Sequence, residues 1–580
     1  MSSRGGIRPL SILKAVPSWT PSLDLGALKN ANTDADPAAF LRSLGAAGIG
    51  ALKHPSGTAA AHSRLLLGSG TALRTAAGRA IGRNNPGPIA PKAGDKRFSD
   101  NAYQENAAYF YLAQQYLLLE HLVNELIDTA ELNDDTAVKA RFAARFILDA
   151  LSPTNTLPGN PAAIRKAFDT GGLSLMRGLR NFLHDLRHNG GWPSQVDRSQ
   201  FAVGVDLGAT PGSVVYRSDL IELIQYTPQT PEVHATPLLF CPPWINKFYI
   251  MDLAPGKSLI EWAVQHGHTC FAISYRNPDA SMSGLGFRDY LFDGPLDAVR
   301  VVREITGSET VNTVSICLGG TLTALGLAYN AAHDDPSIGS ATFINTHTDF
   351  TEPGILGAFT DENSIAALEK QMARKGYLDS AQMARTFSTL RANDLIFQYV
   401  INNWLLGNKP PAFDLLAWNA DSTRMPARMH GEYLRSCYLR NEFSRGEFEI
   451  NGELLDPSRV DIDSYIVAAV DDHVVPWTSS YKTTGLLGGD SRFVLSTSGH
   501  IAGIVNPPSP KAKHWVNETV TADPHEWKAA AELRDGTWWL DWSKWLADRA
   551  GAKRPAPPAL GNAAYPPLDD APGVYVKEEA

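Results

Sequence analysis

The sequence TVSICLGG (residues 313–320) is the clearest indication of the fold class. Its first half is a short apolar run typical of a buried strand, and its second half is a turn of small residues that leads into an apolar, helix-like segment. A cysteine at the apex of a strand–turn–helix unit has the geometry of a nucleophile elbow, usually written G-x-S-x-G. The turn lifts Cys317 above the sheet, and small neighbours such as Gly319 and Gly320 avoid collisions there.

The elbow by itself leaves the function open. Ser315 stands where the usual motif has its first glycine, and a structural cysteine in a tight turn would give the same local sequence. If Cys317 is a nucleophile, the backbone N–H of Leu318 points to the place where an oxyanion would form, at the positive end of the following helix.

Outward from the elbow, short apolar runs alternate with helical patterns. This alternation is typical of an α/β fold whose mostly parallel sheet is covered on both faces. The expected strands lie within 214–227, 236–243, 268–276, 313–320, 341–348, 464–472 and 492–500, and the expected helices within 255–267, 289–305 and 321–333.

The remaining segments predict five parts in the chain. Residues 350–445 have helical patterns and many aromatics but few strand signals, so we expect a cap inserted over the carboxyl edge of the sheet. The α/β core then comprises 201–349 and 446–580, the latter with a C-terminal tail. Amphipathic patterns predict a helical domain at 101–200, preceded by a flexible arm at 1–100.

The arm carries several Lys and Arg but no Asp or Glu between Lys53 and Lys92. One interpretation is a solvated, partly helical segment, and the other is contact with an anionic partner such as a nucleic acid or a lipid surface. The sequence does not decide between them.

Two later strands end in residues that would complete a catalytic triad with Cys317. Asp472 closes the apolar run SYIVAAVDD, and His500 follows RFVLSTSG. The order nucleophile, acid, histidine is that of the α/β hydrolases, and each residue lies just past a strand's carboxyl end, where ligands bind in such sheets. Asp471 could be the acid instead, and His473 could compete as the base.

Composition excludes several other classes of protein. A formal charge of −9 over 580 residues is too mild for a dedicated nucleic-acid binder, and the four cysteines contain no C-x-x-C pair that would suggest zinc. We see no secretory leader and no run of about 18 apolar residues. We therefore expect a cytoplasmic protein with reduced thiols and no membrane span.

Several longer strings are specific to one family. The chain resembles the class I polyhydroxyalkanoate synthases, also called poly-3-hydroxybutyrate synthases, over nearly all of 95–580. The matching strings are DKRFSD (95–100), PPWINKFYIMDL (242–253), HTCFAISYRNPDASM (268–282), CLGGT (317–321), FDLLAWN (413–419), DDHVVPW (471–477), GHIAGIVNPP (499–508) and WWLDWSKWL (538–546).

The resemblance implies an α/β-hydrolase core with a mobile helical cap, a preceding helical domain and a homodimer. It assigns the nucleophile to Cys317, the general base to His500 and the carboxylate to Asp472. It suggests a second oxyanion donor at Ile245, although Trp244 or Asn246 could serve. Arg391 becomes a candidate for the substrate channel, with a structural Arg–Asp pair as the alternative, and His473 a residue near the channel.

The implied activity is an acyltransferase that polymerises (R)-3-hydroxyacyl-CoA thioesters, with short chains such as 3-hydroxybutyryl-CoA, through a Cys thioester. Coenzyme A is the leaving group, and neither a metal nor another cofactor is expected. The partners would be the substrate, the growing polyester at a granule surface and granule-associated proteins. A thioesterase or depolymerase of the same fold, or a non-catalytic granule-binding protein, remains the alternative.

Overall fold

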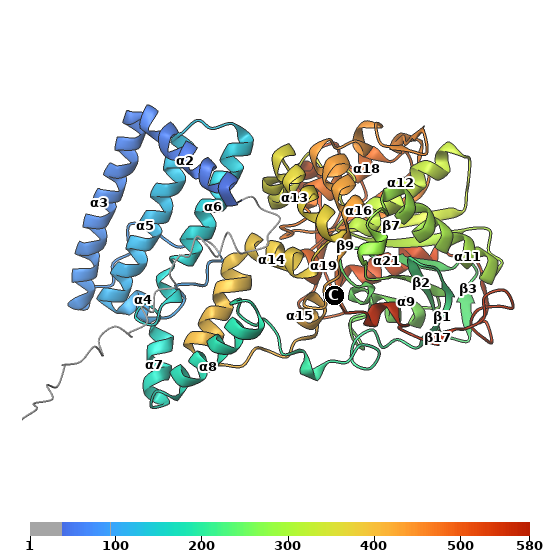
Figure 1. Cartoon of the computed structure of the whole chain (residues 1–580), viewed down its shortest axis with the longest axis horizontal. Coiled ribbons are helices and arrows are strands. Elements are labelled where there is room, and N and C mark those ends of the chain that lie inside the picture. The colour runs from blue at the N-terminus through green and yellow to red at the C-terminus, as the bar shows by residue number, and fades with distance from the viewer. Residues whose placement is uncertain (1–36, 93, 580) are drawn as a thin grey trace, which may run out of the picture. The chain divides into compact units, whose positions relative to one another are not determined.

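The computed structural model describes residues 37–92 and 94–579. The expectation of a flexible arm therefore lies partly outside the described residues, at 1–36. The described chain divides into two compact units: residues 37–194 with 391–409, and residues 195–390 with 410–579. The chain consequently passes from the first unit to the second, back into the first and again into the second (Figure 1).

The first unit is helical and begins earlier than residue 101. Residues 37–80, placed in the expected arm, form two helices because their small residues allow close packing. A Cβ at Gly68 would lie 2.6 Å from Leu118 Cδ2. The helices are α2 (Pro37–Lys53), α3 (Pro55–Ala80), α4 (Ala102–Glu105), α5 (Ala107–Thr129), α6 (Asp134–Ala150), α7 (Pro161–Asp169) and α8 (Leu173–His188).

The second unit contains the expected α/β sheet. Among the described residues, eleven strands pair in the order β15-β14-β13-β12-β7-β6-β4-β5-β2-β1-β17. Pairing is parallel from β5 through β4, β6, β7 and β12 to β13, and antiparallel at both ends. The bounds are β1 Gly212–Arg217, β2 Ile221–Tyr226, β4 Leu238–Cys241, β5 Cys270–Tyr275, β6 Val311–Ile316, β7 Ile338–Ile344, β12 Asp463–Ala469, β13 Ser491–Ser496, β14 Lys513–Val516, β15 Glu532–Asp535 and β17 Asp569–Asp570.

Both faces of this sheet are buried. Leu239 of β4 packs into one apolar cluster, while its neighbours Leu238 and Phe240 pack into another. Successive side chains of a strand point to opposite faces, so the two clusters cover the two sides. Helices of the second unit include α9 (Leu259–Gln265), α11 (Asp297–Thr306), α12 (Leu318–Ala332), α17 (Trp477–Tyr481) and α21 (Trp538–Ala547).

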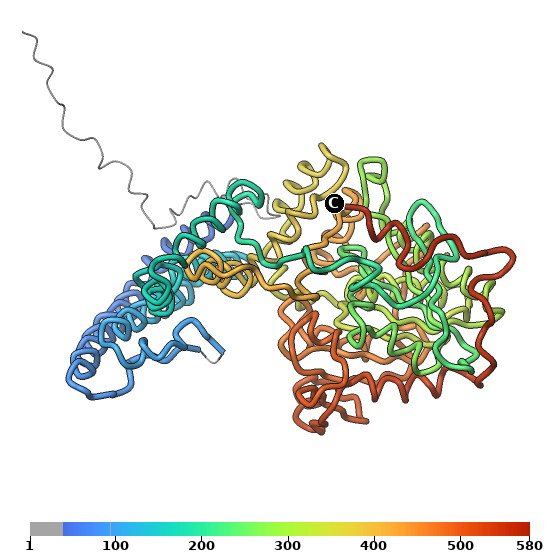
Figure 2. Tube along the Cα trace, turned by 90° about the horizontal axis from the view of Figure 1, so that it is seen from below, coloured from blue at the N-terminus to red at the C-terminus, as the bar shows by residue number. Residues whose placement is uncertain are grey.

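A long insertion connects β7 to β12, where the cap was expected. It contains α13 (Glu362–Lys375), α14 (Ser380–Leu390), α15 (Asp414–Asn419), α16 (Ala427–Glu432) and the π-helix η10 (Tyr433–Leu439). Its middle part, with the π-helices η8 (Asn393–Phe397) and η9 (Val400–Leu405), instead belongs to the helical unit. Asn181 of α8 donates to the carbonyls of Asn403 at 2.9 Å and Asn408 at 2.8 Å, and both Figure 1 and Figure 2 show this segment beside α8.

The C-terminal tail fastens the loop that follows β4. The Nζ atom of Lys247 donates to Asp421 at 2.9 Å and to the carbonyls of Val576 at 2.7 Å and Glu578 at 3.0 Å. Buried Glu222 accepts hydrogen bonds from the backbone of the same tail, at Val574 and Tyr575. Polar groups on the core side thus find their partners in the tail, and the loop after β4 has a fixed path.

Candidate active site

Cys317 lies at the apex of the turn between β6 and α12. Its backbone has φ +50° and ψ −121°, a conformation that costs energy for any residue other than glycine. The Cys317 N–H donates to the carbonyl of Ile344 in β7 at 2.9 Å, which holds the turn against the neighbouring strand. Cys317 is half-buried at this strained apex, which is the expected backbone feature of a nucleophile elbow.

Glycine is required at positions 319 and 320 because backbone lies very close to Gly319 and a buried side chain lies very close to Gly320. A Cβ at Gly319 would be 2.3 Å from the carbonyl oxygen of Cys241, and one at Gly320 would be 2.1 Å from Thr346 Oγ1. Ser315 is accommodated in place of the first glycine because its buried hydroxyl donates to Thr323 Oγ1 at 2.8 Å. The departure from the usual motif therefore leaves no unpaired polar group.

His500 and Asp472 are directly bonded. The Nδ1 atom of His500 donates to Asp472 Oδ2 at 2.6 Å. The other carboxylate oxygen accepts from the backbone N–H groups of Val474 at 2.8 Å and Val475 at 2.9 Å, so the carboxylate is held from both sides. Asp471 is exposed. Of the two candidate acids, Asp472 is the one that contacts the imidazole.

The surroundings of His500 favour its protonated form. Burial alone would lower the pKa of His500, but the charges of Asp472 and Cys317 and the hydrogen bonds to both side chains outweigh burial and raise it to about 10. The structure thus brings Cys317, His500 and Asp472 together, with the imidazole between the sulfur and the carboxylate. A thiol and an imidazole in this arrangement can form an ion pair.

Two polar residues after β7, absent from the sequence prediction, lie at this end of the sheet, and Asn345 contacts His500 directly. Asn345 Nδ2 donates to the backbone carbonyl of His500 at 2.5 Å. His347 Nδ1 lies 2.9 Å from Ser479 Oγ, and burial lowers the pKa of His347 to about 4, which keeps this ring neutral. Both residues belong to the string INTHT (344–348), which lies at the end of an expected strand, as the other site residues do. That location at a strand end is the sequence signal that could have identified them.

Two tyrosines of the cap segment η10 also face the site. Burial raises the pKa of both Tyr433 and Tyr438, and repulsion by Cys317 adds to the rise. Both rings are buried, and Tyr433 also packs edge-on against Trp244 with centroids 6.0 Å apart. The two tyrosines are five positions apart, a spacing that a π-helix aligns and an α-helix does not. Helical pattern analysis therefore missed them.

The candidate oxyanion donors lie near the elbow. Leu318 is the first residue of α12, whose leading N–H groups have no partner within the helix. The loop after β4 contains Ile245 and lies against the same turn, since a Cβ at Gly319 would also be 2.6 Å from the Pro242 carbonyl. Trp244 is buried, and Asn246 forms a β-bridge with Ser422. The roles of these residues as oxyanion donors stay predictions.

The two remaining candidates have different surroundings. His473 is half-buried in the loop that follows Asp472. Arg391 belongs to the helical unit, where it pairs with Asp394. This pair is the structural alternative left open for Arg391, and a channel role for either residue stays a prediction.

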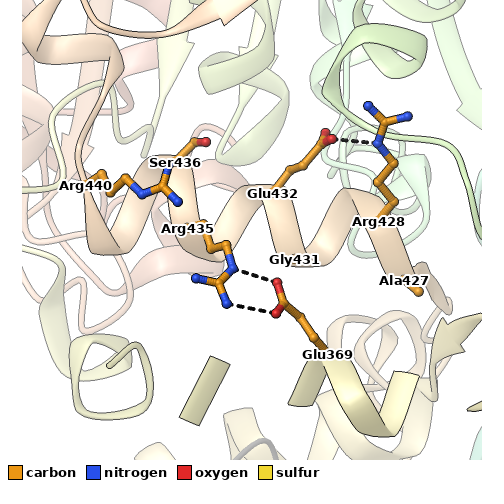
Figure 3. Close-up of a pocket in the computed structure, with 8 residues that line it drawn as sticks. All are labelled: Glu369, Ala427, Arg428, Gly431, Glu432, Arg435, Ser436 and Arg440. Carbon is orange, nitrogen blue, oxygen red and sulfur yellow. Dashed lines mark hydrogen bonds and ion pairs between the residues drawn. The ribbon is translucent and has the colours of Figure 1, made fainter. Parts of the chain in front are cut away.

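A separate pocket lies on the other side of η10. It has a volume of about 350 Å³ and is lined by Glu369, Ala427, Arg428, Gly431, Glu432, Arg435, Ser436 and Arg440. As Figure 3 shows, Arg435 contacts both oxygens of Glu369, at 2.8 and 2.9 Å, and Arg428 contacts Glu432 at 2.7 Å. None of the predicted site residues lines it. The pocket is therefore distinct from the region around Cys317.

The fold and the arrangement of Cys317, His500 and Asp472 define the class of protein. A mostly parallel sheet with a cysteine elbow, and with an acid and a histidine beyond later strands, is an α/β-hydrolase architecture. The model of the α/β hydrolase fold matches residues 236–507. Among the described residues, no helix is long and apolar enough to cross a membrane, and no group of three or more His, Cys, Asp or Glu side chains could hold a metal ion.

Comparison with known proteins identifies the family. A model described as the N-terminus of poly-beta-hydroxybutyrate polymerase (PhaC) matches residues 94–263. The chain is 43% identical to the poly(3-hydroxyalkanoate) polymerase subunit PhaC of Cupriavidus necator, over 84% of this chain and 83% of that protein. It is 44% identical to the poly(3-hydroxyalkanoate) polymerase of Methylorubrum extorquens, over 85% and 82%, and 42% identical to polymerase 2 of Ectopseudomonas oleovorans, over 90% and 92%.

The chain belongs to the poly(3-hydroxyalkanoate) polymerase family. It is an acyltransferase-type enzyme of polyhydroxyalkanoate synthesis built on the α/β-hydrolase fold. The predicted family, fold and enzyme class are thereby confirmed.

Proposed function

We propose that this protein polymerises (R)-3-hydroxyacyl-CoA thioesters into polyhydroxyalkanoate, carrying the acyl chain as a thioester on Cys317 and releasing coenzyme A. The observation that carries the proposal is the contact from Cys317 through His500 to Asp472 at the carboxyl edge of the sheet. The names of the relatives support the substrate class.

In the first step, the Cys317 thiolate attacks the thioester carbonyl of the substrate. A new C–S bond forms, the bond to coenzyme A breaks, and protonated His500 gives its proton to the departing CoA sulfur. One thioester replaces another, so the acyl group stays activated, whereas a serine would trap it as an oxoester. Donors at Leu318 and Ile245 would stabilise the oxyanion by about 3 kcal/mol each.

In the second step, the 3-hydroxyl of another acyl unit attacks the Cys317 thioester. His500 must then accept the hydroxyl proton, although its pKa is about 10 with an unmodified Cys317. Two of the causes of that high pKa are interactions with Cys317 itself. Acylation removes the thiolate charge, so the pKa of His500 falls, and the loaded enzyme converts its acid into a base. An ester bond forms, the C–S bond breaks and Cys317 is free again.

Water must be kept from the acyl-enzyme, because hydrolysis would end the chain. The aromatic side chains of Tyr433, Tyr438 and Phe350 support such exclusion: they are buried, and the rings of Phe350 and Tyr438 lie 5.0 Å apart. His500 is only 9% exposed. A cap of this kind separates the reaction from bulk solvent.

We further propose short acyl chains, with 3-hydroxybutyryl-CoA as the preferred substrate, and activity as a homodimer at the surface of the insoluble polymer. No metal or redox cofactor has a role in these steps, because both bond exchanges need only a thiolate, a proton carrier and backbone donors.

Purified protein mixed with 3-hydroxybutyryl-CoA tests the proposal. We expect release of free CoA thiol together with turbidity from the polymer. Cys317→Ala should abolish both, while Cys270→Ala, at a buried cysteine of β5, serves as the matched control and should retain them. CoA release with only monomeric acid would identify a thioesterase, and no CoA release from wild type would leave only a binding role.

A further inference from the structure

Helix α8 packs against the rest of the helical unit through small and polar residues. Ser174, Gly178 and Asp185 are buried, and a Cβ at Gly178 would lie 1.9 Å from the carbonyl oxygen of Trp404 in η9. Asp185 accepts a hydrogen bond from Trp404 Nε1 at 2.8 Å. Backbone packing, polar bonds and the edge-on contact of Phe182 with Trp404, at 5.0 Å between ring centroids, therefore attach α8 to its unit.

The apolar residues of α8 face outward as a consequence. Met176 is 69% exposed and Leu186 is 54% exposed, values that are unusual for side chains of this kind. The exposed set that we call the α8 stripe recurs at three- and four-residue intervals and comprises Leu173, Met176, Leu179, Leu183 and Leu186. In a water-exposed helix such a stripe normally packs on a core, so a continuous exposed one points to an apolar partner.

The charges beside the α8 stripe show what kind of partner fits. Arg177, Arg180 and Arg187 are exposed on the same helix, and none has an ion pair among the described residues. The single acidic residue of α8, Asp185, is buried and bonded. An apolar stripe bordered by arginines, without exposed acid, is the pattern of helices that lie in the interface of an anionic lipid layer.

We propose that α8 lies on anionic phospholipid, with the α8 stripe in the acyl region and the three arginines at the headgroups. A second copy of this helix would bring the same arginines together, and a neutral polyester surface would give them no counter-charge. The same reasoning bears on the basic segment 53–92 of the sequence, for which an anionic partner was one open interpretation. This proposal is independent of the chemistry at Cys317.

Vesicle co-sedimentation of the full chain tests it. The probes are vesicles of phosphatidylcholine alone and of phosphatidylcholine with 30% phosphatidylglycerol. We expect at least tenfold stronger partition onto the anionic vesicles, reduced by 0.5 M salt. The double change Leu183→Ser/Leu186→Ser should lower the partition at least tenfold, and Arg180→Glu/Arg187→Glu should remove the preference for the anionic lipid.

Leu454→Ser is the matched control, because this leucine is 58% exposed in the other unit, and it should bind like wild type. Thermal melting shows that each variant is folded. Equal binding to both vesicle types, or α8 variants that bind like wild type, would overturn the proposal. So would stronger α8-dependent binding to neutral poly(3-hydroxybutyrate) particles, or a loss of self-association in the α8 variants without any change in vesicle binding.

Discussion

Replacement of Asp472 by asparagine isolates the electrostatic contribution of the carboxylate. Asparagine Oδ1 can still accept the two backbone N–H groups of Val474 and Val475, so the loop keeps its bonds. The other oxygen, however, becomes an NH₂ group that faces His500 Nδ1, and a donor then meets a donor. The charge and the correct imidazole tautomer are both lost.

The size of the effect follows from the His500 pKa. Its rise from 6.5 to about 10 corresponds to about 5 kcal/mol in favour of the imidazolium, supplied by Asp472 and Cys317 against the opposing effect of burial. If Asp472 supplies most of this stabilisation of the imidazolium, the Asp472→Asn variant should acylate roughly 10³- to 10⁴-fold more slowly than wild type. This loss is comparable to the effect of an Asp→Asn change in a serine protease triad.

The assay is single-turnover CoA release from 3-hydroxybutyryl-CoA, with the rate of iodoacetamide alkylation of Cys317 measured from pH 5 to 10. Asp471→Asn is the matched control, since this neighbour is exposed, and its rates should stay within twofold of wild type. Asp472→Asn with more than a tenth of the wild-type acylation rate, or a comparable loss in Asp471→Asn, would refute the reasoning.

Three further predictions concern the elbow and a buried histidine of α16. Gly319→Ala should lower the free energy of unfolding by about 2–3 kcal/mol in a denaturant titration, because its Cβ would meet the Cys241 carbonyl. The variant should also release no CoA, and a variant as stable and active as wild type would contradict this prediction. Burial lowers the pKa of His430 to about 3, and the unfolded chain takes up this proton first, so His430 should contribute a loss of about 2 kcal/mol of stability between pH 8 and 5. His430→Leu should therefore change the stability difference between pH 8 and 5 by about that amount relative to wild type, and an identical difference in the two proteins would contradict this. Cys317→Ser should acylate weakly and form no turbidity, and vigorous polymer formation by this variant would contradict the thioester argument.

Sequence patterns predict the position of the site residues that follow strands. Cys317, Asp472 and His500 each follow a buried strand, and parallel strands end at one edge, so strand order alone predicts that the three meet. The mostly parallel sheet was predicted for the same reason, because apolar runs bounded by turn residues are local signals. The catalytic roles of the three side chains stay predictions.

The rest depends on contacts that no local pattern encodes. Tyr433 and Tyr438 reach the site through the packing of a π-helix, whose alignment differs from that of an α-helix. Residues 391–409 have the helical character of a cap, yet they pack with α8 because Gly178 permits a close approach to the backbone at Trp404. The helical signal of that segment predicts its conformation but not its packing partner.

The repeated passage of the chain between the two units affects how the enzyme can be divided. A single proteolytic cut near residue 195 would not release the helical unit, because 391–409 would still tether it from within the other fragment. For the same reason, a truncated protein that starts at residue 195 would carry η9 without α8 and expose the surfaces that they share. Splitting this protein into independently expressed halves therefore requires that 391–409 be moved with the helices it packs against.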